Sequence, residues 1–248
     1  MKYIFLFIIT AILLSFSKEG NAAIEYDKNG KIISKTYPSL DLSRPIDSII
    51  YFKNNKVDYK VIFKTKEDVF VKYYDPKEKL ICEGNTNKKI RAGKWKYYRE
   101  NGSLDKIIEY INLCGQQYVN QGWYFKENGD TIFRNSNYVN IKIDNGNFKI
   151  NEKHEFKFDY KKILGPKSEL ILMISPDVDD KFCNIEKINM SKQYSKVNQI
   201  IAKIGFATAG KKTLRGYITE FQDSIKTREK MPKIAERRVY FQIPIVVE

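Results

Sequence analysis

One pattern between residues 73 and 134 constrains the fold of the 248-residue chain most strongly: an aromatic run that ends in Asn-Gly and then returns. Residues 93–102 read GKWKYYRENG, and residues 122–129 read GWYFKENG. Asn-Gly between two apolar runs is the strongest short-range signal for a β-hairpin, because Asn and Gly readily adopt the positive φ angles of a tight turn. The stretch therefore predicts antiparallel hairpins.

The same unit recurs along this stretch. An aromatic pair comes first, a short polar turn follows, and an aliphatic residue resumes the strand. The aromatic pairs are Tyr73-Tyr74, Tyr97-Tyr98 and Tyr124-Phe125. A spacing of 24 and then 27 residues predicts stacked hairpins that bury their aromatic faces against one another. Two further hairpins are expected before the repeats, around Asn29-Gly30 and Asn54-Asn55.

Residues 93–102, with Glu83-Gly84 before them and Glu109-Tyr110 after them, resemble the bacterial variant of the MORN repeat, which is often labelled antitoxin-like in exported proteins. The resemblance covers about 60 of the 248 residues. It implies a twisted antiparallel β-meander that acts as a scaffold or an interaction surface. The antitoxin label implies an inhibitor of one partner protein.

The two tryptophans are expected to differ in exposure. Trp95 and Tyr97 are two residues apart and share a face of a strand, whereas Trp123 directly precedes Tyr124 and faces away from it unless a bulge intervenes. Trp123 is therefore the better candidate for an exposed aromatic residue, and core packing is the alternative role for both tryptophans. The candidate partner-binding residues are Trp123, Tyr124, Trp95, Tyr97 and Tyr98.

Beyond the polar joint at residues 135–137, short apolar segments alternate with turns, which is typical of a β-sandwich. The expected strands are 138–143, 148–150, 155–160, 169–175, 198–206, 212–221 and 239–247. Residues 210–218 resemble the penultimate strand of immunoglobulin-like domains in exported bacterial proteins. Residues 224–238 are expected to form a long loop, with one or two helical turns as the alternative, because Met231-Pro232 disfavours a helix.

The chain is therefore predicted to be all-β. Residues 23–136 are expected to form an antiparallel β-meander with MORN-like hairpin repeats, clearest at 69–134, and residues 137–248 an immunoglobulin-like β-sandwich domain. Residues 1–22 have the pattern of a signal peptide: Lys2, an uncharged apolar run from Ile4 to Phe16, and small residues at the cleavage point. The run is short for a membrane span, so we expect export to the periplasm, the outer membrane or the outside of the cell.

The formal net charge of +14 favours acidic partners such as anionic lipid headgroups or acidic glycans. The lysines are spread evenly along the chain, which is also what a solvated surface requires. Together with export, this makes nucleic acid an unexpected partner. A protein or an envelope glycan is the expected one, with peripheral contact to an anionic membrane surface as a further option.

Three cysteines, Cys82, Cys114 and Cys183, leave two interpretations open. Cys82 pairs with Cys114, which lies in the neighbouring repeat, or all three are buried thiols that pack as small apolar residues. The sequence contains no C-x-x-C motif, so neither a zinc site nor a redox site is indicated.

Few residues in the sequence are candidates for catalysis. The single histidine, His154, has no H-E-x-x-H partner and no G-x-S-x-G elbow to serve, so we interpret it as a surface residue. Residues 177–181, DVDDK, resemble the start of a calcium loop but lack its glycine and its final glutamate, which favours a polar turn. We therefore expect no enzyme activity, no cofactor and no metal. The expected function is a non-catalytic exported interaction or structural module of the cell envelope; the alternative is a secreted antitoxin-like inhibitor.

Overall fold

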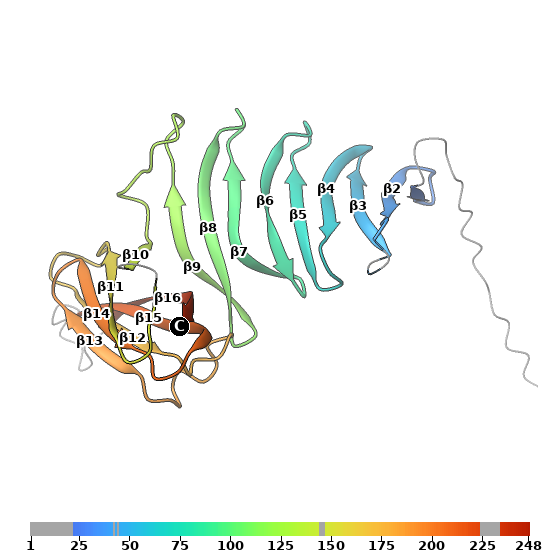
Figure 1. Ribbon diagram of the computed structural model, residues 1–248. Helices are drawn as coiled ribbons and strands as arrows, with labels where there is room; N and C mark the ends of the chain where they lie inside the picture. The colour runs from blue at the N-terminus through green and yellow to red at the C-terminus, as the bar shows by residue number, and fades with distance from the viewer. Residues whose placement is uncertain (1–21, 42, 44, 144–146, 224–233) are drawn as a thin grey trace, which may run out of the picture. The chain divides into compact units, whose positions relative to one another are not determined.

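The computed structural model describes residues 22–41, 43, 45–143, 147–223 and 234–248. The signal peptide predicted for residues 1–22 lies outside this range, apart from Ala22, and so does the predicted turn at Asn145-Gly146. The described residues form sixteen strands in three antiparallel sheets and no helix, which confirms the predicted all-β class (Figure 1). No helix in the described ranges is long and apolar enough to cross a membrane.

The first sheet is a meander in which strands β1 to β9 follow chain order. The chain divides into two compact units, one ending at Lys88 and the other beginning at Lys89. The joint predicted at residues 135–137 lies inside the second unit. The first unit holds β1 (Ala23–Tyr26), β2 (Ile32–Pro38), β3 (Ile46–Lys53), β4 (Lys56–Phe63), β5 (Asp68–Tyr74) and β6 (Leu80–Asn87).

Three hairpin turns of the meander and the turn that follows β9 share one geometry. The N–H of the first turn residue donates to the carbonyl four residues later, and the N–H of the fourth residue donates back, at 2.8–3.0 Å. The turns begin at Asp27, Asp75, Arg99 and Lys126. The fourth residue has a positive φ angle and is Gly30, Glu78, Gly102 or Gly129. Glycine adopts this conformation without steric cost, which explains why Asn-Gly marks three of the four turns.

The turns that alternate with these along the meander are shorter. Asn54 and Asn55 have φ angles of 53° and 63°, the two positive values that a two-residue type I′ hairpin requires. The predicted hairpin across these asparagines is therefore confirmed as β3 and β4.

The second unit begins with the last three strands of the meander, β7 (Ile90–Tyr98), β8 (Leu104–Leu113) and β9 (Gln116–Tyr124). After the turn at 126–130 the chain doubles back along β9, and Gly122 and Asn137 exchange both backbone hydrogen bonds, at 3.0 and 2.8 Å. The segment 131–137 thereby pairs with the outer edge of β9. Covering an edge in this way protects it from pairing with other chains.

The rest of the second unit consists of two sheets that share one core. The core draws on both sheets, with Phe156, Phe158 and Leu172 wholly buried among its members. One sheet has the order β10-β11-β14 and the other β13-β12-β15-β16. The bounds are β10 (Val139–Ile143), β11 (Lys153–Tyr160), β12 (Glu169–Ser175), β13 (Ser191–Ser195), β14 (Gln199–Gly205), β15 (Gly210–Asp223) and β16 (Ile234–Val247).

Two expectations for this part of the chain were wrong. The polar strand β13 was not predicted, and residues 234–238 belong to β16 rather than to a loop. The pairing of β16 with β15 extends without interruption to Ile234 opposite Asp223, so the partner strand fixes residues whose own sequence favours a loop. The rest of that predicted loop, 224–233, lies outside the described residues.

Candidate interaction surfaces

Trp95 is wholly buried, with 0% of its surface exposed. The guanidinium of Arg91 lies 4.5 Å from the centre of its ring, and Tyr110 meets it edge-on at 6.4 Å. Arg91 also donates to the hydroxyl groups of Tyr97 and Tyr110, at 2.7 and 3.1 Å. Of the two roles left open for Trp95, the structure therefore shows core packing, and this side chain offers no surface to a partner.

Trp123 lies on the face of the sheet opposite to Trp95, and no bulge separates it from Tyr124, so it faces away from Tyr124 as predicted. Trp95 is opposite Ile108, whose partner on β9 is Gly122, so Trp123 falls one residue out of line with Trp95. Its ring is half-buried and stacks on Tyr138, with centres 5.5 Å apart and planes at 22°. The ammonium of Lys94 lies 4.7 Å from the ring centre. The remaining candidates, Tyr97, Tyr98 and Tyr124, are half-buried.

Tyr138, on which Trp123 stacks, lines a groove of about 460 Å³. We call it the aromatic groove; its lining consists of Phe133, Tyr138, Asn140, Asp159, Tyr160, Lys161, Val197, Asn198 and Gln199. Phe133, in the segment that covers β9, is 64% exposed, and Val197 is 66% exposed. Apolar and aromatic walls with a few amides and charged groups, here Asp159 and Lys161, are the usual composition of a binding site.

The carboxylate of Asp159 is held in a fixed position in this groove. Gln199 donates to one oxygen at 2.7 Å, and the Lys142 ammonium lies 2.8 Å from the other. The hydrogen bond from Gln199, followed by that from Lys142, lowers the pKa of Asp159. The groove therefore holds an ionised carboxylate at neutral pH, which is ion-paired with Lys142, and Lys161 is a basic residue of the same lining.

The first unit carries a second aromatic surface, which the sequence alone did not reveal. Tyr51, Tyr59 and Tyr73 are directly opposite one another on β3, β4 and β5. Their ring centres are 4.4 and 5.6 Å apart, and Tyr73 is 36% exposed. The sequence feature that could have revealed this surface is the Asn54-Asn55 turn. It sets the register of β3 and β4, and with the bulge between Tyr51 and Phe52 it pairs Tyr51 with Tyr59.

Asn120 joins the meander to the two-sheet region. Its side chain accepts from the backbone N–H of Tyr240 and donates to the carbonyl of Tyr240, both at 2.8 Å. The same amide donates to Glu109 at 2.7 Å. Beside it, Arg237 donates to the carbonyl of Asn120 at 2.9 Å and to the side chain of Asn137. These buried contacts fix β16 against β9.

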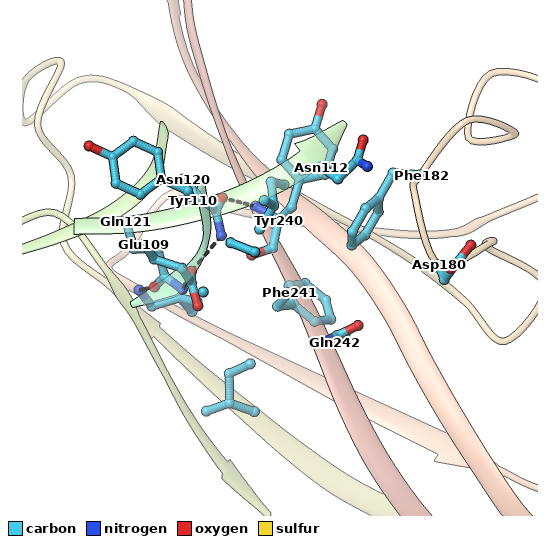
Figure 2. A pocket seen from close by; sticks show the side chains of 15 residues that line it. Glu109, Tyr110, Asn112, Asn120, Gln121, Asp180, Phe182, Tyr240, Phe241 and Gln242 are labelled. Carbon is cyan, nitrogen blue, oxygen red and sulfur yellow. Dashed lines mark hydrogen bonds between the residues drawn. The ribbon is translucent and has the colours of Figure 1, made fainter. Parts of the chain in front are cut away.

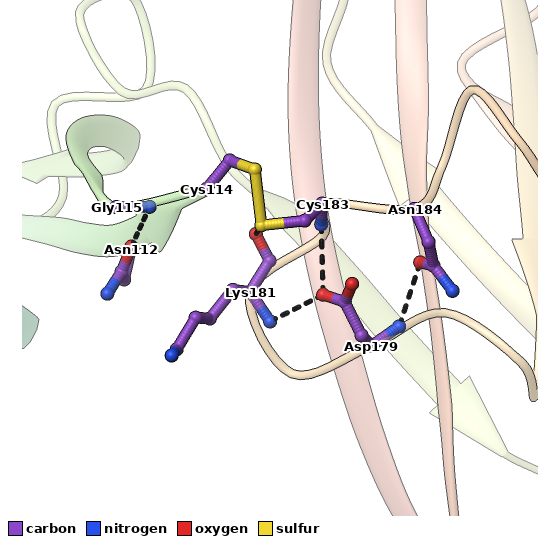
Figure 3. Close-up of a disulfide and its surroundings, with 7 residues drawn as sticks. All are labelled: Asn112, Cys114, Gly115, Asp179, Lys181, Cys183 and Asn184. Atoms are coloured by element: carbon purple, nitrogen blue, oxygen red, sulfur yellow. Dashed lines mark hydrogen bonds between the residues drawn. A yellow bond between two sulfur atoms is a disulfide. The ribbon is translucent and has the colours of Figure 1, made fainter.

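A disulfide between Cys114 and Cys183 connects the same two parts of the chain (Figure 3). Cys114 is in the β8–β9 turn, and its N–H donates to the carbonyl of Lys181 at 2.9 Å. The pairing of Cys82 with Cys114 was therefore wrong, as was the interpretation of three buried thiols. Cys82 is buried on β6 and is not part of this bond.

A cavity of about 330 Å³ lies between the meander strands β8 and β9 and the edge strands β10 and β16 (Figure 2). Its walls include the aromatic residues Tyr110, Phe182, Tyr240 and Phe241. The ionisable acids in the lining are Glu109 and Asp180, and no lysine or arginine is among its fifteen described lining residues. Glu109 accepts from the side-chain amides of Asn120 and Gln121, each at 2.7 Å.

The residues singled out for chemistry have structural roles. His154 accepts from the N–H of Lys149 at 3.1 Å and packs edge-on against Phe148. Asp179 accepts from the N–H groups of Lys181 and Cys183, each at 2.9 Å, which is the predicted polar turn (Figure 3). In the described ranges, no three His, Cys, Asp or Glu side chains gather where they could hold a metal.

One buried acid was missed by the sequence analysis. Glu220 is wholly buried and accepts from the backbone N–H groups of Ile163 and Leu164, from Ser168 at 2.6 Å, and from Tyr160 at 3.2 Å. Burial is the main cause that raises the pKa of Tyr160 to about 12; Glu220 raises it further, and the Arg237 guanidinium opposes both. Because its oxygens already accept these bonds, Glu220 anchors the segment 163–168.

Comparisons of the chain with protein-family models, with curated proteins and with solved structures found no match. The MORN-like and immunoglobulin-like resemblances therefore stay predictions from sequence.

Proposed function

We propose that the protein is a non-catalytic, exported interaction module of the bacterial cell envelope that presents an aromatic β surface to protein or glycan partners. The aromatic groove carries the proposal. It combines an exposed Phe133, Tyr138 backed by Trp123, and a fixed Asp159 carboxylate on paired strands and the segment 131–137. Aromatic rings supply contact area at a low cost in conformational entropy, and amides and carboxylates supply specific hydrogen bonds.

The rigid attachment of this region supports the same role. The disulfide, the Asn120 side chain and Arg237 hold the two-sheet region to the end of the meander, so the groove is preorganised. The disulfide also supports export, because such bonds persist in oxidising compartments. With the predicted signal peptide, it favours the periplasm or the cell exterior.

Capture from an envelope extract tests the proposal. Phe133→Ala removes the most accessible ring of the groove, and Tyr194→Ala removes a ring of nearly equal exposure, 63%, outside it. We expect Phe133→Ala to weaken retention of envelope polymers or proteins about tenfold, which corresponds to the loss of one aromatic contact. Tyr194→Ala is expected to bind like the wild type.

Equal binding by all three proteins would rule out the groove as the contact surface. One tight stoichiometric partner whose activity disappears on binding would instead favour the secreted inhibitor. Turnover of a captured component would contradict a non-catalytic role.

A further inference from the structure

The cavity between β10 and β16 has features that the aromatic groove lacks, and the two share no lining residue. Glu109 lies in its wall and is half-buried. Both hydrogen bonds to its carboxylate come from neutral amides, and among the described residues no lysine or arginine forms an ion pair with it. Lys94 is directly opposite Glu109 on β7, and its ammonium lies 4.7 Å from the centre of the Trp123 ring.

The cavity wall suits a positively charged group. Asp180, an exposed acid, is also a lining residue, and Phe182, Tyr240 and Phe241 contribute aromatic surface. An ammonium or guanidinium group is attracted both by a carboxylate and by the face of an aromatic ring. None of the described lining residues is a lysine or an arginine.

Two strand edges border the same cavity. The N–H of Val139 donates to the side chain of Gln121, and the N–H and carbonyl of Tyr240 bond to Asn120, so these backbone groups point away from β11 and β15. In an antiparallel ladder, alternate residues point to the same side. Ile141 and Gln242, two residues further along, therefore direct their backbone groups to the free sides, where no described residue bonds to them.

Strand addition along all of β16, which its apolar sequence suggested, is limited by the fold. Asn120 occupies the edge at Tyr240, and the N–H of Glu248 donates to Phe148 at 2.8 Å at the other end. Pro244 has no N–H to offer between them. The accessible part of the edge is thus the short stretch around Gln242, beside the cavity.

We propose that this cavity binds an extended peptide segment of a partner protein, with a lysine or arginine side chain directed to Glu109. Backbone groups of Ile141 or Gln242 pair with the peptide backbone, and the aromatic wall covers the cationic side chain. Addition of a peptide to a strand edge, with a pocket for one side chain, is a recurrent mode of recognition.

Isothermal titration of the full chain, with its disulfide intact, tests the proposal. The probe is acetyl-Thr-Val-Lys-Val-Thr-amide, compared with the same peptide carrying norleucine in place of lysine. We expect the lysine peptide to bind about tenfold more tightly, which is the effect of one charge-assisted hydrogen bond. A lysine peptide that is N-methylated at both valines should bind more weakly, because it lacks the backbone donors for strand pairing.

The matched variants are Glu109→Gln and Glu127→Gln. Glutamine at 109 still accepts from Asn120 and Gln121, so the fold is retained while the charge is removed. The preference for lysine should disappear in Glu109→Gln and persist in Glu127→Gln, which makes the same charge change at an exposed turn residue.

Equal affinity for the lysine and norleucine peptides, absence of saturable binding, or an unchanged preference in Glu109→Gln would each overturn the proposal. Phe133→Ala should leave peptide binding intact, so failure at the cavity and failure at the aromatic groove are distinguishable.

Discussion

Tyr160 lies between a buried carboxylate and a guanidinium: its hydroxyl donates to Glu220 at 3.2 Å and accepts from Arg237 at 3.0 Å. Its pKa is raised from 10 to about 12, so the folded state resists loss of this proton. The stabilisation from this shift is fully present below pH 10 and is lost as the pH rises through about 12. It amounts to about 3 kcal/mol.

We therefore expect the free energy of unfolding in urea to fall between pH 10 and pH 12, and to fall less in Tyr160→Phe. The variant starts about 1 kcal/mol less stable at pH 8, because Glu220 and Arg237 each lose a hydrogen bond. Tyr194→Phe, which removes the hydroxyl of an exposed tyrosine, should follow the wild type. If the curves of Tyr160→Phe and the wild type ran parallel, Tyr160 would not be the titrating group.

The predictions for single residues were correct where the two-residue period of a β-strand decides which face a side chain takes. Trp123 faces away from Trp95 because it directly follows its glycine, Gly122, whereas Trp95 is two residues after Gly93, and this offset is visible in the sequence. The burial of Trp95 could not be predicted from this pattern. Trp95 is covered by Arg91, a residue four positions away whose long side chain folds back over the ring.

The junction of β8 and β9 with the loop after β12 is the element on which the arrangement of the second unit depends. Its disulfide joins residues 69 positions apart. A cross-link over a loop of this length stabilises the folded state by about 4 kcal/mol in the chain-entropy model. We expect reduction, or Cys183→Ser, to lower the free energy of unfolding by about this amount in a denaturant titration.

The control is Cys82→Ser. It should keep the full response to reductant, because Cys82 is not part of the bond, although loss of a buried sulfur lowers its starting stability. A response to reductant that disappears in Cys82→Ser would show that Cys82 takes part in the disulfide in solution.

Among the elements, the hairpins could be predicted from the sequence, whereas pairings between segments far apart in the chain could not. Asn-Gly and Asn-Asn turns specify which strands pair, because the information is local. The polar strand β13 has no alternation of its own and is extended because it pairs with β12. The bond between Cys114 and Cys183 depends on β16 packing against β9, which no local pattern encodes.

In the second unit, both candidate binding sites are assembled from segments far apart in the chain. The aromatic groove combines Phe133, Asp159 and Val197, and the cavity combines Glu109, Ile141 and Gln242. Each residue alone is an ordinary strand or loop position. The sequence indicated an aromatic β surface, but the sites follow from packing between sheets, which a single sequence does not specify.

The central claim, that the aromatic groove is a binding surface, is tested most directly by fluorine NMR. The chain contains two tryptophans, so labelling with 5-fluorotryptophan gives two resonances. Trp123 stacks on a residue of the groove and Trp95 is wholly buried on the opposite face of the sheet. On saturation with the partner retained in the capture experiment, we predict that the Trp123 resonance shifts and the Trp95 resonance does not. A saturated complex in which the Trp123 resonance is unmoved would contradict the claim.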